Sequence, residues 1–172
     1  MTQASQAPDP SQLVADMKAI LSKITSIMRN YVPPFTVKPQ VVDTDWVAQR
    51  LERLPNWSWW RWLPLDGKYY AVHLEDWTRM ARWDVTNYLP YVRDRFDCDK
   101  YALLFKARMA EFFGVNTVAV VLDYDAGHSY NLVFPLDMDE PLIYEPQTDS
   151  FIPLDKRDTR FYALDTMYLV LL

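Results

Sequence analysis

Apolar side chains first recur with helical spacing in the segment that begins at Ser11, a residue that can cap a helix. They follow one another at alternating steps of four and three residues, at Leu13, Met17, Ile20, Ile24, Ile27 and Tyr31. Three more apolar residues widen this stripe on one flank, namely Val14, Leu21 and Met28. A helix with such a face buries it against something, and the pattern leaves open whether that is its own chain or a partner.

The proline-containing segment YVPPFTVKPQ follows this helix and separates it from the rest of the chain. We therefore predict an N-terminal helical arm with its linker over residues 1–40 and a domain over residues 41–172. All seven tryptophans fall in the first part of that domain, around two predicted short helices at 45–54 and 74–83. Large aromatic residues in a small domain are usually core, although a sugar-stacking platform or a peptide groove is an alternative.

The last eighty residues combine one long helix with several strands. A helix predicted from about residue 97 to 113 ends at Gly114, which suits a left-handed cap. The apolar runs VNTVAVVLDY and HSYNLVFPL are joined by DYDAGH and predict a hairpin, and three further strands follow in PLIYEPQ, SFIPL and TMYLVLL. This order of elements predicts the α+β class.

Composition and charge narrow the range of partners. The 172 residues are 50% hydrophobic and carry a formal net charge of -5, without a basic run or stripe, so we expect no nucleic-acid partner. The longest apolar runs are far shorter than the roughly 20 residues that cross a bilayer, so we expect no membrane partner. The single cysteine and the polar first residues, which lack the features of a secretory signal, lead us to expect a cytoplasmic protein.

Three residues stand in an order that thiol chemistry uses. Cys98 is the only cysteine and lies at the predicted start of the long helix, His128 opens the second strand of the hairpin, and Glu145 ends the next strand. A helix N-terminus and an imidazolium both favour a thiolate, an imidazole can move a proton, and a carboxylate can orient the imidazole. Asp97 and Asp99 flank the thiol, and their negative charge opposes this effect.

The motifs around these residues resemble those of a known family. DCDKYALLFKARMAEFFGVNTVAVV, GHSYNLVF and LIYEPQT are similar to the motifs of the transglutaminase-like branch of the papain-like cysteine protease superfamily. They are also similar to the cysteine-protease domain attached to a fungal agglutinin, in which the third residue is a glutamate. The resemblance implies a papain/transglutaminase-like core of one long helix packed on a mostly antiparallel sheet, with the N-terminal helix as an appendage.

The same resemblance implies a function and a set of catalytic residues. Cys98 would be the nucleophile, His128 the general base and acid, and Glu145 the group that orients the imidazole. The expected activity is that of a cysteine peptidase or amidase, either a hydrolase or an acyltransferase, which acts through a thioester on an amide bond in a peptide or in peptidoglycan. No cofactor and no metal is expected. We also expect one wall of an open cleft at Cys98 to come from the tryptophan-rich segment.

Two other functions remain as alternatives. The chain could be a structural or interaction component of a larger assembly, for example a virus particle, with the N-terminal helix as the contact to another copy or partner. It could also be a carbohydrate-binding module built on the tryptophans, although we find no repeat in the sequence. Zinc and calcium are weaker candidates, because His73, His128 and Cys98 lack paired-ligand spacing and the acidic clusters lack a complete calcium loop.

Overall fold

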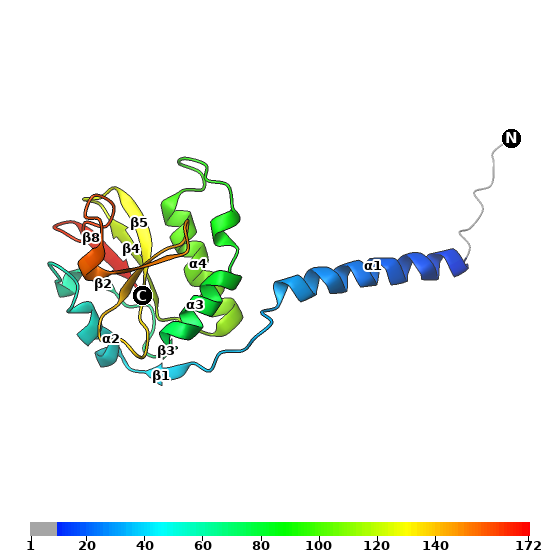
Figure 1. Cartoon of the computed structure of the whole chain (residues 1–172), viewed down its shortest axis with the longest axis horizontal. Coiled ribbons are helices and arrows are strands. Elements are labelled where there is room, and N and C mark those ends of the chain that lie inside the picture. The colour runs from blue at the N-terminus through cyan, green and yellow to red at the C-terminus, as the bar shows by residue number, and fades with distance from the viewer. Residues whose placement is uncertain (1–9) are drawn as a thin grey trace. The chain divides into compact units, whose positions relative to one another are not determined.

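The computed structural model describes the backbone of residues 10–172 and the side chains of residues 11–24 and 32–172 (Figure 1). The chain divides into two compact units, Met1–Phe35 and Thr36–Leu172. The first unit contains the predicted N-terminal helix, α1 (Pro10–Tyr31). The side chains of Ile27, Met28 and Tyr31, which belong to the predicted apolar stripe, lie outside the described residues.

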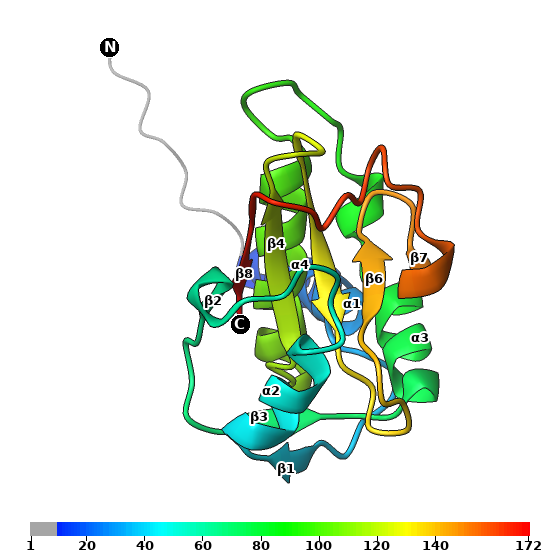
Figure 2. The same cartoon turned by 90° about the vertical axis from the view of Figure 1, so that its left-hand side faces the viewer.

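A six-stranded sheet with the order β2-β8-β4-β5-β6-β7 forms the centre of the second unit (Figure 2). Its strands are β2 (Trp62–Leu63), β4 (Val118–Asp123), β5 (His128–Val133), β6 (Leu142–Glu145), β7 (Ser150–Pro153) and β8 (Tyr168–Leu171). Neighbouring strands run antiparallel except at one edge, where β2 pairs with β8 in parallel. The hairpin and the three later strands that the apolar runs predict are confirmed.

Three helices and a small sheet complete the second unit. The helices are α2 (Thr44–Leu51), α3 (Leu74–Trp83) and α4 (Cys98–Phe113). The small sheet pairs β1 (Gln40–Val42) with β3 (Tyr69–Ala71), and three short 3-10 helices lie at Trp59–Arg61, Thr86–Tyr88 and Leu154–Lys156. The predicted helices near residues 45–54, 74–83 and 97–113 are therefore confirmed to within a few residues.

Helix α4 covers one face of the central strands. The buried amide of Asn131 in β5 donates to the carbonyl oxygen of Ala102 in α4 at 2.9 Å and to that of Ala119 in β4 at 3.0 Å. The ring of Phe105 in α4 stacks on that of Tyr144 in β6 with the centroids 4.2 Å apart. These contacts hold the first half of α4 against β4, β5 and β6.

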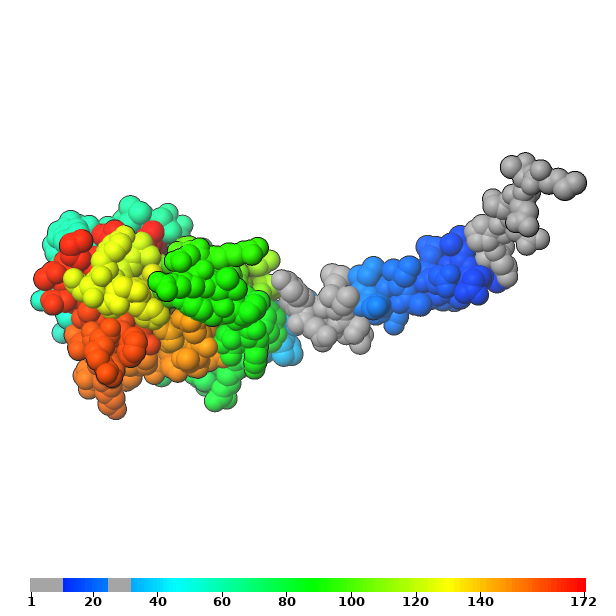
Figure 3. All heavy atoms as spheres, turned by 90° about the horizontal axis from the view of Figure 1, so that it is seen from above, coloured from blue at the N-terminus to red at the C-terminus, as the bar shows by residue number. Residues whose placement is uncertain are grey.

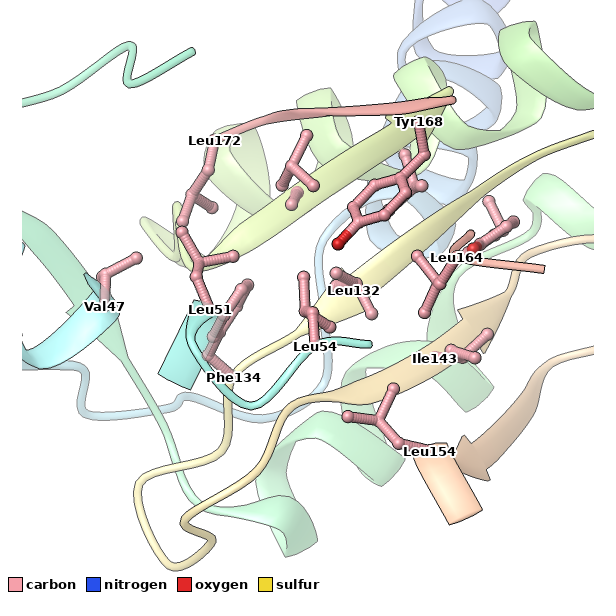
Figure 4. Packing of buried hydrophobic residues seen from close by; sticks show 14 of the residues in the cluster. Val47, Leu51, Leu54, Leu132, Phe134, Ile143, Leu154, Leu164, Tyr168 and Leu172 are labelled. Atoms are coloured by element: carbon pink, nitrogen blue, oxygen red, sulfur yellow. The ribbon is translucent and has the colours of Figure 1, made fainter. Parts of the chain in front are cut away.

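The opposite face of the sheet carries the second half of the core. Val47 and Leu51 of α2 and the following Leu54 belong to one buried cluster with Leu132 of β5 and Ile143 of β6 (Figure 4). Since both faces are covered, β4, β5 and β6 are buried at nearly every position, which explains why β4 is an almost continuous apolar run instead of an alternating one.

The predicted core of one long helix on a sheet is therefore corrected. Within the described residues the sheet is packed on both faces, with α4 on one side and α2 with the segments that follow β7 on the other. The sequence interpretation assigned no packing partner to the second face, because the apolar residues that cover it are scattered over a short helix and irregular segments.

Gly114 ends α4 in the left-handed region, with a φ of 63°, and its N–H donates to the carbonyl oxygen of Ala110. We expect Gly114→Ala to lower the free energy of unfolding by about 1 kcal/mol, because a Cβ disfavours this backbone conformation. Urea unfolding measures the loss. Gly67→Ala is the matched control, since Gly67 has no positive φ and open space around its Cα, and equal losses in the two variants would contradict the assignment.

Candidate functional site

A cavity of about 390 Å³ opens where α4 begins beside the turn between β4 and β5. One wall is the first turn of α4 with the residue before it, 97–100, and the other comes from the hairpin, 122–124 and 127–129. The strand register places Asp123 opposite His128 at the end of the hairpin, and Gly127 takes a φ of 60° in the turn between them. The fold thus brings residues about thirty positions apart to one opening.

Cys98 and His128 both line this cavity, as the sequence predicted for a shared site. Cys98 is the first residue of α4, is partly exposed and forms no disulfide. The described residues that line the cavity include no tryptophan, so the expectation that the tryptophan-rich segment forms a cleft wall at Cys98 is wrong. Trp62 lies instead in β2, at the edge of the sheet.

The negative charges around the thiol are partly neutralised by a lysine that the sequence analysis did not consider. The ammonium of Lys100 donates to Asp97 and to Asp99, each at 3.0 Å. Hydrogen bonds with Asp99 and with Lys100 lower the pKa of Asp97 to about 2, and the two carboxylates raise the pKa of Lys100. The mouth of the cavity therefore carries two negative charges and one positive charge instead of two unopposed carboxylates.

His128 and Glu145 form a short polar contact, with 2.7 Å between His128 Nε2 and Glu145 Oε2. A carboxylate only accepts, so Nε2 carries the proton, and Nδ1 is then the acceptor of the neutral ring. Both side chains are largely buried, which strengthens the contact and fixes the plane of the imidazole. The structure thus brings together the predicted pair.

Glu145 is held by further donors that sequence reasoning missed. The hydroxyl of Tyr162 donates to Glu145 Oε2 at 3.2 Å, and the backbone N–H of Gln147 donates to Oε1 at 3.1 Å. Burial and the negative charge of Glu145 raise the pKa of Tyr162, so this hydroxyl keeps its proton and its role as donor. Gln147 follows Glu145 by two residues and could have been suggested by position, whereas Tyr162 lies in an irregular segment and carries no sequence signal.

A second buried carboxylate, in the wall of the cavity, stabilises the end of the hairpin. Asp123 accepts from the hydroxyl of Tyr130 at 2.9 Å, from the backbone N–H of Leu164 at 2.9 Å and from that of Ala126 at 3.2 Å. These bonds explain the acidic residue at this turn without calcium. Among the described residues, no group of three or more histidine, cysteine, aspartate or glutamate side chains is arranged to hold a metal ion.

His73, the second histidine, is not part of this site. It precedes α3, is half exposed, and its Nδ1 lies 3.7 Å from Asp137. Of the helices that the structure describes, none has the length and apolar character that crossing a bilayer demands.

Comparison with known proteins places the chain in a family. The family profile described as "Ricin-type beta-trefoil lectin C-terminal domain" matches residues 35–162, more than half of the 172 residues, and the chain belongs to this family. The description refers to the C-terminal domain of such lectins, and in this chain the matched residues form the mixed sheet and helices described above. No curated protein matches the chain.

Two solved structures share the fold. One is described as "PSL1a-E64 complex"; it is 18% identical, has a TM-score of 0.57 and is matched over 77% of this chain and 51% of its own. The other is Polyporus squamosus lectin bound to the human-type influenza-binding epitope Neu5Aca2-6Galb1-4GlcNAc, with 16% identity, a TM-score of 0.56 and coverage of 77% and 49%. The chain thus spans about half the length of these proteins.

These findings correct the resemblance suggested by the sequence motifs. Membership of the transglutaminase-like branch of the papain-like superfamily, and the fold class and domain name derived from it, are replaced by the lectin C-terminal domain family. The predicted cysteine-dependent hydrolase or acyltransferase and its peptide or peptidoglycan substrate are overturned by the same match. Short motifs around Cys98, His128 and Glu145 suggested that class because they specify residue types and order but not the ligand.

The partly exposed thiol leads to a first prediction for the site. We expect Cys98 in the folded protein to react with iodoacetamide, because its cavity is open to solvent, and we expect His128→Ala to slow the reaction by removing a proton acceptor from the same cavity. Intact-mass spectrometry over time measures the rate. His73→Ala should leave it unchanged, and an unreactive thiol or equal rates in all three proteins would contradict the shared site.

Buried tyrosines lead to a second prediction. Burial first, and then the neighbouring carboxylates, raise the pKa values of Tyr130, Tyr144 and Tyr162. The unfolded chain, with tyrosine pKa values of about 10, therefore loses protons before the folded chain does. Below about pH 10 the three tyrosines are protonated in both states, and their stabilising contribution is fully present. Above about pH 10 the free energy of unfolding falls with pH, by up to about 1.4 kcal/mol per pH unit for each tyrosine that is protonated in the folded chain but not in the unfolded chain.

Urea unfolding between pH 8 and 11.5 measures this fall, and Tyr130→Phe should make it less steep. The matched control is Tyr88→Phe, because Tyr88 is 79% exposed and should leave the slope unchanged. A stability that does not change across this pH range would contradict the assignment.

Proposed function

We propose that this chain serves a lectin-type, carbohydrate-binding function and that the cavity between α4 and the β4–β5 hairpin takes the carbohydrate. The observation that carries the proposal is the family match over residues 35–162. The glycan epitope named with Polyporus squamosus lectin supports the class of ligand.

The lining of the cavity suits a ligand rich in hydroxyl groups. Asp97, Asp99 and Nδ1 of His128 supply acceptors, Lys100 supplies donors, and the hydroxyl of Ser129 can do both. Hydrogen bonds to charged groups contribute about 1.5 to 3 kcal/mol each, so two or three of them would orient a sugar ring. Tyr124 adds an exposed aromatic ring at the rim, against which the apolar face of a sugar can pack.

Within this site we propose that Cys98, His128 and Glu145 work as one unit. Glu145 fixes the imidazole through the 2.7 Å contact, His128 presents its other ring nitrogen to the ligand, and Cys98 forms part of the opposite wall. The catalytic role that the sequence predicts for these three residues stays a prediction.

Titration of the full chain with Neu5Aca2-6Galb1-4GlcNAc tests the function. We expect heat of binding by calorimetry and at least a tenfold weaker affinity in His128→Ala and in Lys100→Ala, because each removes a charged or polar contact of about 1.4 kcal/mol or more. His73→Ala is the matched control and should bind as the unchanged chain does. Absence of binding, or binding that these cavity variants leave unaltered, would contradict the proposed site.

A second probe separates carbohydrate binding from chemistry at the thiol. E64, the small molecule named with PSL1a, can be incubated with the chain and the intact mass recorded. A site that only binds carbohydrate leaves the mass unchanged. A mass increase that Cys98→Ala abolishes would show a covalent reaction at this residue and would contradict a purely carbohydrate-binding role.

A further inference from the structure

Helix α1 carries a long apolar surface of exposed side chains. Six described side chains on it are between 47% and 64% exposed, namely Leu13, Val14, Met17, Ile20, Leu21 and Ile24. Five of the six, all but Leu13, line one continuous groove along the helix together with Lys18. Figure 3 draws the described residues of α1 in blue. Most of the stability of a helix in a protein comes from the packing of its apolar face, so a surface of this size on α1 indicates a packing partner.

We infer that α1 pairs side by side and antiparallel with α1 of a second copy of this chain. The alternating steps of four and three place Leu13 and Ile20 at one core position of a heptad and Met17 and Ile24 at the other. Two helices with this spacing interlock along one seam. An antiparallel pair lays Leu13 and Ile20 of one copy against Ile24 and Met17 of the other.

The two flanks of the seam decide between orientations. On one flank, Asp16 and Lys23 occupy the same heptad position, one turn on each side of Ile20. An antiparallel partner brings Lys23 opposite Asp16, and the two-fold symmetry of the pair makes this contact twice. A parallel partner would place Asp16 beside the apolar Leu21 and would leave both charges without an opposite charge.

The other flank agrees with the same orientation. Val14 and Leu21 share the heptad position on the far side of the seam, and an antiparallel partner lays Val14 of one copy against Leu21 of the other. One flank of the pair is therefore apolar and the other is charged with complementary signs. A self-complementary face of this kind fits a second copy of α1 better than an unrelated surface.

Sedimentation velocity of the full chain over a range of concentrations tests the inference. We expect a concentration-dependent dimer, and we expect Ile20→Asp to be monomeric, because it places a charge in the centre of the seam. Ser22→Asp is the matched control, since Ser22 is exposed on the opposite face of the helix and its variant should dimerise normally. A chain that is monomeric at every concentration, or a dimer that survives Ile20→Asp, overturns the inference.

Exchanging the charges tests the orientation. Asp16→Lys and Lys23→Asp each replace two attractions by two repulsions, and each should raise the dissociation constant of the dimer about tenfold. The double variant Asp16→Lys with Lys23→Asp restores both pairs and should recover the original affinity. Single variants without effect, or a double variant as weak as either single one, would exclude the antiparallel register. This result does not depend on whether the cavity of the second unit binds a carbohydrate.

Discussion

The site depends on the way one buried amide fastens α4 to the β4–β5 hairpin. Asn131 donates from the middle of β5 to the carbonyl oxygen of Ala102 and to that of Ala119. These two bonds fix the position of α4 along the strands. Because Ala102 is one turn beyond Cys98, this contact sets where α4 begins relative to His128 at the start of the same strand. The apolar clusters on both faces of the sheet then hold this arrangement in place.

Two carboxylates hold the sheet side of the cavity by different means. Asp123 accepts hydrogen bonds from the hairpin turn and from the backbone N–H of Leu164. Glu145 fixes the imidazole of His128 and also accepts hydrogen bonds from Tyr162 and Gln147. Both are buried and satisfied, so their charges serve to position other groups. The partly exposed charges of Asp97, Asp99 and Lys100 remain to meet a ligand. This division between positioning and contacting groups accounts for a polar cavity on a largely apolar sheet.

Sequence patterns predicted the elements better than their packing or the family. Gly114, the apolar runs of β4 and β5, and the heptad spacing of α1 identified the helices and strands, because these signals are local. The sequence did not predict that α2 packs on the second face of the sheet. Val47, Leu51 and Leu54 make this contact, but many nearby residues are equally apolar, so the pattern does not single them out. Cys98 and His128 line one cavity and Glu145 contacts His128, but residue types and order alone led to the wrong class of protein. Lys100 and Tyr162 were overlooked because their roles arise only from three-dimensional contacts.

The central claim, that the cavity at the start of α4 takes the carbohydrate, is tested most directly by mapping backbone amide chemical shifts. Neu5Aca2-6Galb1-4GlcNAc would be added to the isotopically labelled chain and the perturbed amides assigned. The account predicts that the largest changes fall at residues 97–100 and 127–129. Changes confined to the exposed tryptophans Trp59 and Trp60, or no changes at saturating epitope, would contradict it.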